Sequence, residues 1–169
     1  MDHQVTARNF LNYVRRDIQA NPRDPKSQFV LVLFRFCQVL MANRESPRKR
    51  SLPVIVLYRL MTECILGIEL RPKTRVGPGV SIFHGFGLVV NDQCVLGRDV
   101  TLRNGVTIGH KRKGGGCPQI GDGVDIGAGA IVIGEILVGD GARVGAGSVV
   151  IESVPAGAVV AGNPARIIG

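Results

Sequence analysis

The chain has 169 residues, enough for one sizeable core or for a core with a small appendage. Its composition is 45% hydrophobic but only 5% aromatic, with no tryptophan, which is typical of a narrow aliphatic interior. Lys and Arg outnumber Asp and Glu by 21 to 13, and residues 1–71 carry twelve of the basic groups and six of the acidic ones. This N-terminal excess could favour an anionic membrane surface, although a solvated face or an oligomer contact explains it as well.

The spacing of the cysteines and the apolar runs indicate in which cellular compartment the protein resides. The four cysteines form no CxxC pair and no zinc-binding spacing. The first apolar run, residues 29–41, lies behind several charges, unlike a signal peptide, and it is too short to span a bilayer. The second, residues 52–68, is interrupted by Arg59 and Glu63. We therefore expect a cytoplasmic protein, with a place at the inner face of the membrane as the alternative, and at most peripheral membrane contact through the basic N-terminal helices.

The composition changes sharply at Gly67, because all 23 glycines lie at or after it. Upstream, the patterns predict helices over residues 5–20, 26–43 and 53–66. The prolines of NPRDP end the first helix, and Pro53 suits the first turn of the third. We expect a helical N-terminal region over residues 1–66 and a second domain over residues 67–169. The apolar stripe predicted for the first helix consists of Phe10, Leu11, Val14 and Ile18.

A six-residue repeat dominates the second domain. Between Ile120 and Ile151 an aliphatic residue recurs at every sixth position, and a glycine directly follows four of these six residues. This period matches neither an amphipathic helix nor a single alternating strand, and it is typical of a solenoid with six-residue sides. We expect each side to hold a short strand and a corner where glycine accepts backbone angles that strain other residues. The residues predicted to line this prism are Ile120, Ile126, Val132, Val138, Val144 and Val150.

The same period begins at Leu70 and is interrupted twice. After Leu88 it shifts by two residues. After Ile108 the eleven residues GHKRKGGGCPQ stand where five would keep the period, which predicts a loop of six extra residues that leaves the repeat in phase. The chain is thus predicted to be mainly β. The earlier residues predicted to line the prism are Leu70, Val76, Ile82, Leu88, Leu96, Leu102 and Ile108.

Several motifs are more specific than the repeat. GIELRP, IFHGFG, TLRNGVTIG, GGGCPQIGDGV, IGAGA, VGAGSVV and AGNPARIIG follow one another in this order. Residues 67–169 thereby resemble the hexapeptide-repeat acyltransferases of the serine acetyltransferase branch, and within it the colanic-acid and capsular polysaccharide O-acetyltransferases of bacteria. The resemblance implies a left-handed parallel β-helix, although most parallel crossovers are right-handed. It also implies a homotrimer, or a dimer of trimers, with acetyl-CoA bound between neighbouring prisms.

Acetyl transfer from a thioester to an alcohol needs a base for the hydroxyl proton and donors for the oxyanion of the tetrahedral intermediate. Histidine suits the first task because its ordinary pKa lies near neutrality. His3 lies near the terminus and His110 opens the inserted loop, whereas His84 matches the family's catalytic base. The resemblance makes Glu69 the carboxylate that orients this base, and its separation of fifteen residues is close to one coil of eighteen. The alternative for Glu69 is a surface carboxylate at the start of the first strand.

The acceptor site departs from the serine acetyltransferase pattern. There an Asp precedes the catalytic histidine and an Arg-His pair precedes the proline after the loop, whereas this chain has Phe83, Gly116 and Cys117. The loss of these polar groups argues against L-serine, and an apolar Phe83 suits the apolar face of a pyranose. For Cys117 the sequence places no base nearby, so a small hydrophobe is favoured over a nucleophile. The residues assigned to the acceptor are Phe83, Asn91, Arg103 and Cys117.

Acetyl-CoA is the expected co-substrate. The loop offers cations and backbone N–H groups suited to phosphates, without the Gly-Lys-Ser/Thr of a nucleotide P-loop, although a solvated basic loop explains Lys111, Arg112 and Lys113 equally well. Ala128 and Ala146 are eighteen residues apart and match family positions along the pantetheine arm, with steric economy at a corner as the alternative. The residues assigned to acetyl-CoA are Gly109, His110, Lys111, Gly127, Ala128, Gly145, Ala146 and Arg166.

The sequence therefore predicts an acetyl-CoA-dependent O-acetyltransferase that acts on a sugar hydroxyl of a bacterial surface polysaccharide or its precursor. Transfer would be direct, with His84 as general base. Serine acetylation for cysteine biosynthesis and a catalytically silent β-helix scaffold are the alternatives. A zinc carbonic anhydrase on the same scaffold is disfavoured because its site needs three histidines, two of them closely spaced. We expect a carbohydrate acceptor, no metal and no nucleic-acid partner.

Overall fold

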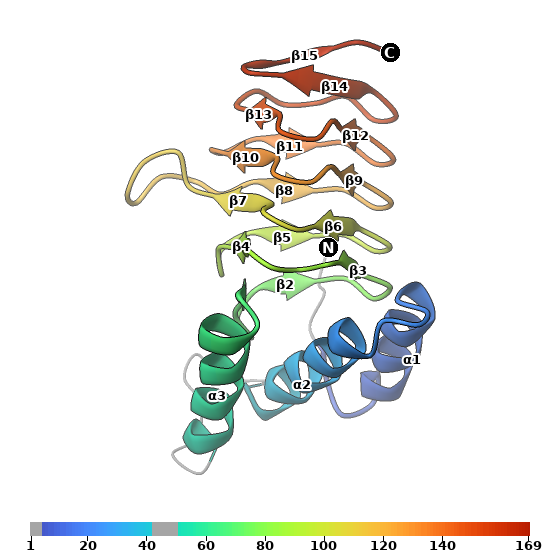
Figure 1. Cartoon of the computed structure of the whole chain (residues 1–169), viewed down its shortest axis with the longest axis vertical. Coiled ribbons are helices and arrows are strands. Elements are labelled where there is room, and N and C mark those ends of the chain that lie inside the picture. Colours follow the sequence, from blue (N-terminus) through green and yellow to red (C-terminus); the bar gives the residue numbers. More distant parts are fainter. Residues whose placement is uncertain (1–4, 42–50) are drawn as a thin grey trace.

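The computed structural model of the chain describes residues 5–41 and 51–169, and it shows a prism of short strands standing on a group of helices (Figure 1). The strands form three sheets around one aliphatic interior. The helices lie together at the end of the prism where the strands begin, and the chain climbs from there to its C-terminus at the opposite end. The predicted mainly β solenoid preceded by helices is confirmed.

The helices begin and end close to their predicted bounds. They are α1 (Phe10–Ala20), α2 (Pro25–Met41) and α3 (Leu52–Arg59), and α3 continues as a π-helical turn, η1 (Leu60–Ile65). The first helix starts later than predicted because residues 6–9 form a turn, in which the Thr6 N–H donates to the Asn9 side chain at 2.7 Å. The basic SPRKR turn and the end of the second predicted helix lie outside the described residues.

The buried face predicted for α1 is wrong. Leu11 is 76% exposed and Ile18 is 39% exposed, whereas Tyr13 and Asp17 are buried. The reason is a polar contact, which a pattern of hydrophobic residues cannot reveal. The Asp17 carboxylate accepts hydrogen bonds from the backbone N–H groups of the first coil, which turns this face of the helix toward the prism.

Each coil of the prism contributes one strand to each sheet, and neighbouring strands pair in parallel except at the C-terminal end, where β15 runs antiparallel to β14. Sheet A consists of β1 (Ile68–Leu70), β4 (Leu88–Val90), β7 (Thr107–Gly109), β10 (Ile131–Ile133) and β13 (Val149–Val150). Sheet B consists of β2 (Arg75–Val76), β5 (Val95–Leu96), β8 (Gln119–Ile120) and β11 (Leu137–Val138). Sheet C consists of β3 (Ser81–Phe83), β6 (Thr101–Arg103), β9 (Asp125–Ile126), β12 (Arg143–Val144), β14 (Val159–Gly162) and β15 (Ala165–Ile167).

The aliphatic residues predicted to line the prism are all buried, with no more than 3% of any one exposed. The predicted register is wrong in one detail, because Leu70 pairs with Val90 and not, as the period suggested, with Leu88. The two extra residues therefore lie in the corner between β3 and β4, and the first coil has twenty residues instead of eighteen. The later insert behaves as predicted, since Leu96 pairs with Ile120 across it.

The glycines that follow the aliphatic positions serve a different purpose from the one predicted. Gly127 keeps an ordinary backbone angle, but a Cβ there would lie 2.5 Å from the backbone nitrogen of Ala146 in the next coil. A Cβ on Gly139 would meet the nitrogen of Ala156 at the same distance. These glycines allow consecutive coils to approach closely. The left-handed backbone angles occur at the following corner glycines, such as Gly129 with a φ of +68°.

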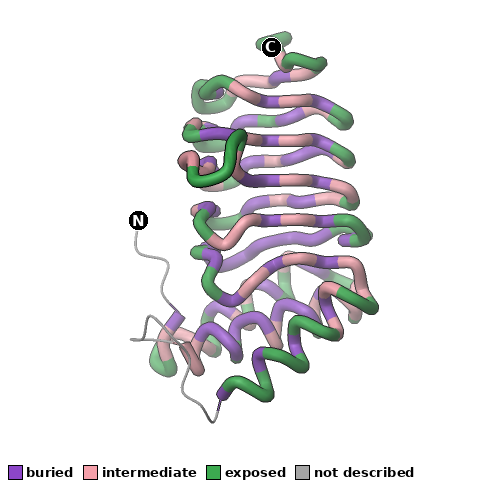
Figure 2. The backbone as a smooth tube through the Cα atoms, turned by 90° about the vertical axis from the view of Figure 1, so that its left-hand side faces the viewer, coloured by how far each residue is buried: buried purple, intermediate pink, exposed green. Residues whose placement is uncertain are grey.

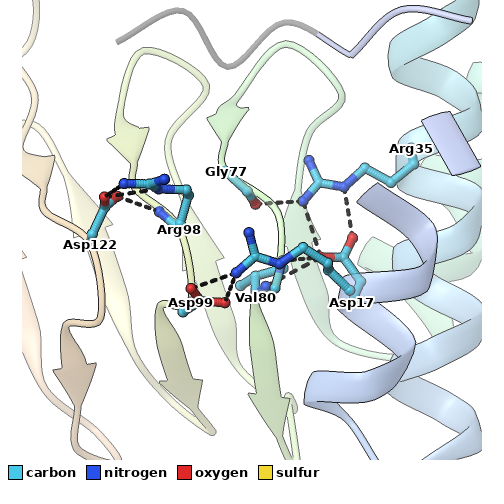
Figure 3. Close-up of polar contacts among 9 residues, drawn as sticks. Asp17, Arg35, Gly77, Val80, Arg98, Asp99 and Asp122 are labelled. Carbon is cyan, nitrogen blue, oxygen red and sulfur yellow. Dashed lines mark hydrogen bonds and ion pairs between the residues drawn. The ribbon is translucent and has the colours of Figure 1, made fainter. Parts of the chain in front are cut away.

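Side chains from the helices bond to the exposed edge of the first coil, where no lower coil exists (Figure 3). Asp17 accepts from Gly79 and Val80 and pairs with buried Arg35, whose guanidinium donates to the carbonyls of Val76 and Gly77, both at 2.7 Å. The other donors to first-coil carbonyls are Asn21, Ser27, Gln38 and Tyr58. The helices thus replace the missing coil as a polar cap.

The coloured tube in Figure 2 shows the consequence of this arrangement: buried and partly exposed residues alternate along the strands, and exposed residues gather at corners and on the outer faces of the helices. The insert after β7 projects away from the prism as a loop (Figure 1). Within residues 5–41 and 51–169, no helix combines the length and apolarity needed to cross a bilayer.

Candidate active site

The three corners of each coil stack into three edges of the prism, and two of these edges carry the predicted site residues. The first, called the His84 edge, comprises residues 84–87, 104–105, 128–129 and 146–147. Backbone bonds join its levels: Gly105 donates to Phe86 at 2.9 Å, Gly129 to Asn104 at 2.9 Å, and Gly147 to Ala128 at 2.8 Å. The second, called the loop edge, comprises residues 91–94, 110–118 and 134–136. Sheet A separates the two edges.

His84 lies in the enlarged corner between β3 and β4. Its backbone is left-handed, with a φ of +61°, which is uncommon for a residue other than glycine. This conformation is a form of local strain that tends to accompany functional sites. The side chain is exposed to solvent, so a substrate can reach the imidazole. The two residues added to this coil therefore present His84 outside the regular wall.

Glu69 lies near this corner, at the centre of β1. The preceding Ile68 side chain lies against Gly85, and the Gly67 carbonyl accepts a hydrogen bond from Gly87 at 2.7 Å. The Glu69 carboxylate is held by Arg71 at 2.9 Å, and Arg71 also reaches Glu63 at 3.4 Å. Among the described residues this guanidinium is the partner shown for Glu69, and its pairing with His84 remains a prediction.

Phe83 and Arg103 form a contact on the outer face of sheet C. They are neighbours in register on β3 and β6, and the Arg103 guanidinium lies 5.7 Å from the centre of the Phe83 ring. Arg103 also pairs with Asp125 on β9 and donates to the Ile126 carbonyl at 3.3 Å. The Asp125 hydrogen bond raises the pKa of the Arg103 guanidinium, so its charge is fixed. Two predicted acceptor residues are thereby brought together.

The loop edge joins residues that the sequence assigned to different ligands. The Cys117 sulfur lies 3.4 Å from His110 Nδ1 and 3.4 Å from Asn91 Oδ1. The prediction that Cys117 has no nearby base is therefore wrong, because the loop folds back and returns it to His110. Burial nevertheless raises the pKa of the Cys117 thiol, which favours the protonated form. This cluster can make hydrogen bonds, but it does not hold an activated thiolate.

The residues assigned to acetyl-CoA fall into three groups. Ala128 and Ala146, with Gly127 and Gly145 beside them, stand on the His84 edge above the histidine. The group of Gly109, His110 and Lys111 lies on the loop edge, across sheet A, where the Lys111 side chain passes Gly134. Arg166 lies on β15 at the far end of sheet C, with its guanidinium 3.8 Å from Glu152. Within one chain these groups do not meet.

The sequence and the fold of the chain were compared with those of known proteins. No protein-family model matches the chain. A relative named as a colanic acid biosynthesis acetyltransferase, WcaB of Escherichia coli strain K12, is 39% identical over 155 residues, which cover 89% of this chain and 96% of that protein. Serine acetyltransferase 4 of Arabidopsis thaliana is 36% identical over 175 residues, or 98% of this chain, which spans about half (49%) of the plant protein.

The chain belongs to the hexapeptide-repeat acetyltransferases. Among solved structures, a serine acetyltransferase from Neisseria gonorrhoeae matches with a TM-score of 0.83 and 32% identity, over 96% of this chain and 68% of that one. The Brucella abortus strain S19 serine acetyltransferase in complex with coenzyme A matches with a TM-score of 0.80 and 32% identity, over 96% of this chain and 69% of that one. This acetyltransferase is therefore of the serine acetyltransferase branch, has the left-handed β-helix of that branch, and uses acetyl-CoA.

Two residues that lie beside the candidate site were not singled out in the sequence analysis. Phe86 is the second aromatic residue of FHGF, and 68% of it is exposed. Asp125 holds Arg103, but it is one of several acidic residues in the repeat and carries no distinguishing signal. The aromatic pair could have been noticed, because aromatic residues make up only 5% of the chain. Asp125 required the register of β6 and β9, in which Thr101 stands beside it.

Proposed function

We propose that this acetyltransferase moves the acetyl group of acetyl-CoA to a sugar hydroxyl of a bacterial surface polysaccharide or its precursor. The observation that supports this best is the surroundings of His84. The neighbouring Phe83 presents an exposed ring, and the cation beside that ring, Arg103, is already paired with Asp125. Such surroundings suit an uncharged ring with hydroxyl groups better than the ammonium and carboxylate groups of serine. The likeness to WcaB along nearly its whole length supports the same acceptor class.

The proposed reaction is a direct transfer. His84 takes the proton of the acceptor hydroxyl as its oxygen attacks the thioester carbonyl. The tetrahedral intermediate then collapses, the carbon–sulfur bond breaks, and the thiolate of coenzyme A leaves and takes up the proton from the imidazolium. Glu69, held by Arg71, would steady the imidazolium. Ala128 and Ala146 would let the pantetheine arm run along the His84 edge, since they add no bulk there.

We further propose that the protein acts as a homotrimer. The exposed side of α3 and of its continuation η1 includes Leu52, Val54, Val56, Leu57 and Leu60, and a helix with so apolar a surface is normally covered. A trimer would also bring the loop edge of one chain to another chain, which would let Gly109, His110 and Lys111 join the coenzyme groups that they do not reach within one chain. Peripheral membrane contact and a dimer of trimers are the other ways of covering α3. Mass measurement in solution and flotation with anionic vesicles separate these three states.

Serine acetylation is the second candidate, because serine acetyltransferases of known structure match nearly the whole chain. The deciding experiment measures coenzyme A release from acetyl-CoA with L-serine and with a panel of oligosaccharides. We expect turnover with at least one carbohydrate at a kcat/KM above that with serine. A higher kcat/KM with serine than with every carbohydrate would reject the proposed acceptor and establish the second candidate.

A further inference from the structure

We propose that Phe83 and Phe86 form an aromatic platform on which a pyranose ring binds with one of its hydroxyl groups at His84. This inference rests on the proposed function for the class of acceptor, and it adds the way in which that acceptor is held. The two rings flank His84 in the chain, and 46% of Phe83 and 68% of Phe86 are exposed. Phe83 ends β3 in sheet C, whereas Phe86 lies beside the start of β1 in sheet A. In the chain, His84 therefore lies between two exposed aromatic residues, one at the end of sheet C and one beside the start of sheet A.

Phe86 is held in place although it is exposed. Its carbonyl accepts a hydrogen bond from Gly105 at 2.9 Å, and the next residue, Gly87, donates to Gly67 at 2.7 Å. The ring lies against the backbone of Gly67, where a Cβ would be 2.8 Å from Cδ2 and Cε2 of the ring. A glycine at this position thus lets the ring lie close to the chain. An exposed ring that is already fixed loses little freedom when it binds a ligand.

Phe83 is held by a contact between its ring and a guanidinium group. The Arg103 guanidinium lies 5.7 Å from the centre of its ring, and Asp125 pairs with that guanidinium from the next strand. The attraction between a cation and the face of an aromatic ring favours this arrangement. Asp125 thereby holds the guanidinium beside the Phe83 ring.

Exposed aromatic rings favour a ligand that has an apolar face. One face of a pyranose carries only C–H bonds, which pack well on an aromatic face, while its hydroxyl groups project from the rim toward polar groups. His84, exposed and in a left-handed backbone conformation, stands where such a rim would lie. Serine has no comparable apolar face. An adenine ring or a side chain of a neighbouring copy could also cover aromatic rings, and the test separates these occupants.

The test compares the unmodified protein with three variants. Phe86→Leu removes the ring but keeps apolar bulk, Phe86→Tyr keeps the ring, and Phe36→Leu alters an exposed ring on α2, outside the His84 corner. Binding of methyl β-D-galactopyranoside, whose ring has three adjacent C–H bonds on one face, is followed by saturation-transfer NMR. The KM values for the best carbohydrate of the panel and for acetyl-CoA are measured in parallel, together with the mass in solution.

We expect Phe86→Leu to raise the carbohydrate KM about three- to tenfold and to weaken the glycoside signal, as the loss of one aromatic contact predicts. Phe36→Leu should match the unmodified protein, Phe86→Tyr should keep the glycoside signal because it keeps the ring, and the KM for acetyl-CoA should not change. A rise in the acetyl-CoA KM would assign the ring to the coenzyme, and a changed mass would assign it to a neighbouring copy; either result overturns the platform. An unchanged carbohydrate KM also overturns it while leaving the proposed function intact, whereas absence of any carbohydrate turnover rejects the proposed function itself.

Discussion

At the scale of single residues, the left-handed backbone of His84 decides which substitution can test its role. Alanine would add backbone strain to the loss of the imidazole, whereas asparagine tolerates a φ of +61° better than most residues. We therefore expect His84→Asn to fold normally and to lose at least about 10²-fold in kcat, the usual effect of removing a general base. Steady-state kinetics and a thermal melt measure the two effects. His110→Asn, in the loop assigned to acetyl-CoA, should raise the KM for acetyl-CoA more than it lowers kcat, and an equal loss of kcat in both variants would contradict the assignment.

Cys117 gives a second prediction at this scale. Because burial raises the pKa of its thiol, the thiolate forms only at a higher pH than in an ordinary cysteine. We expect iodoacetamide to modify exposed Cys64 first at neutral pH, and the modification of Cys117 to accelerate as the pH is raised. Peptide mass spectrometry over a pH series measures both sites. Cys117→Ser should retain most of the activity, and a loss as large as that of His84→Asn would point to a covalent route instead.

Individual contacts such as these are what the sequence predicted least well. The motif and the period were sufficient to single out His84, but Glu69 is held by Arg71, and His110 is returned to Cys117 by the fold of the loop. Both contacts depend on side-chain directions that a linear spacing does not encode. Asp17 shows the same limit, since a charged residue in an amphipathic helix is expected to face solvent, yet it is buried against Arg35.

At the scale of elements, the close approach of consecutive coils makes some glycines irreplaceable. A Cβ at Gly127 would meet backbone atoms of the next coil, which cannot move aside as a flexible side chain can. We expect Gly127→Ala to lower the free energy of unfolding by about 3 kcal/mol, the upper end of the usual cost of overpacking. Urea denaturation measures this. Ala146→Ser, at an exposed corner position, is the control and should change stability by less than about 0.5 kcal/mol.

The elements themselves were largely predictable, for a physical reason. A repeat of six residues fixes every inward position once one is known, so most of the buried column from Leu70 to Val150 followed from the spacing alone. The exception was the corner between β3 and β4, where Leu88 and Val90 are both aliphatic and both buried. The sequence could not distinguish them, and the pairing of Leu70 with Val90 decided the register.

At the scale of the whole molecule, the buried pair of Arg35 and Asp17 joins the helices to the prism. Removing one partner leaves the other charge buried and unpaired, which commonly costs about 3–5 kcal/mol. We therefore expect Arg35→Met to be strongly destabilised in urea denaturation. The control is Arg98→Met, whose exposed pair with Asp122 (Figure 3) should contribute little to stability, because solvent screens an exposed ion pair. Equal losses in the two variants would contradict the role of the buried pair.

The polar cap also determines how long the solenoid can grow. Stacked coils have no intrinsic stop, because the last strand of each sheet offers the same unpaired groups as the one before it, and a second molecule could add there. On the first coil those groups are occupied by Asn21, Ser27 and Gln38, so that end of the molecule does not serve as a template. A chain without residues 1–66 would therefore be expected to join end to end into filaments, visible by electron microscopy. The helices thus limit an architecture that could otherwise continue by adding further coils to a finite length.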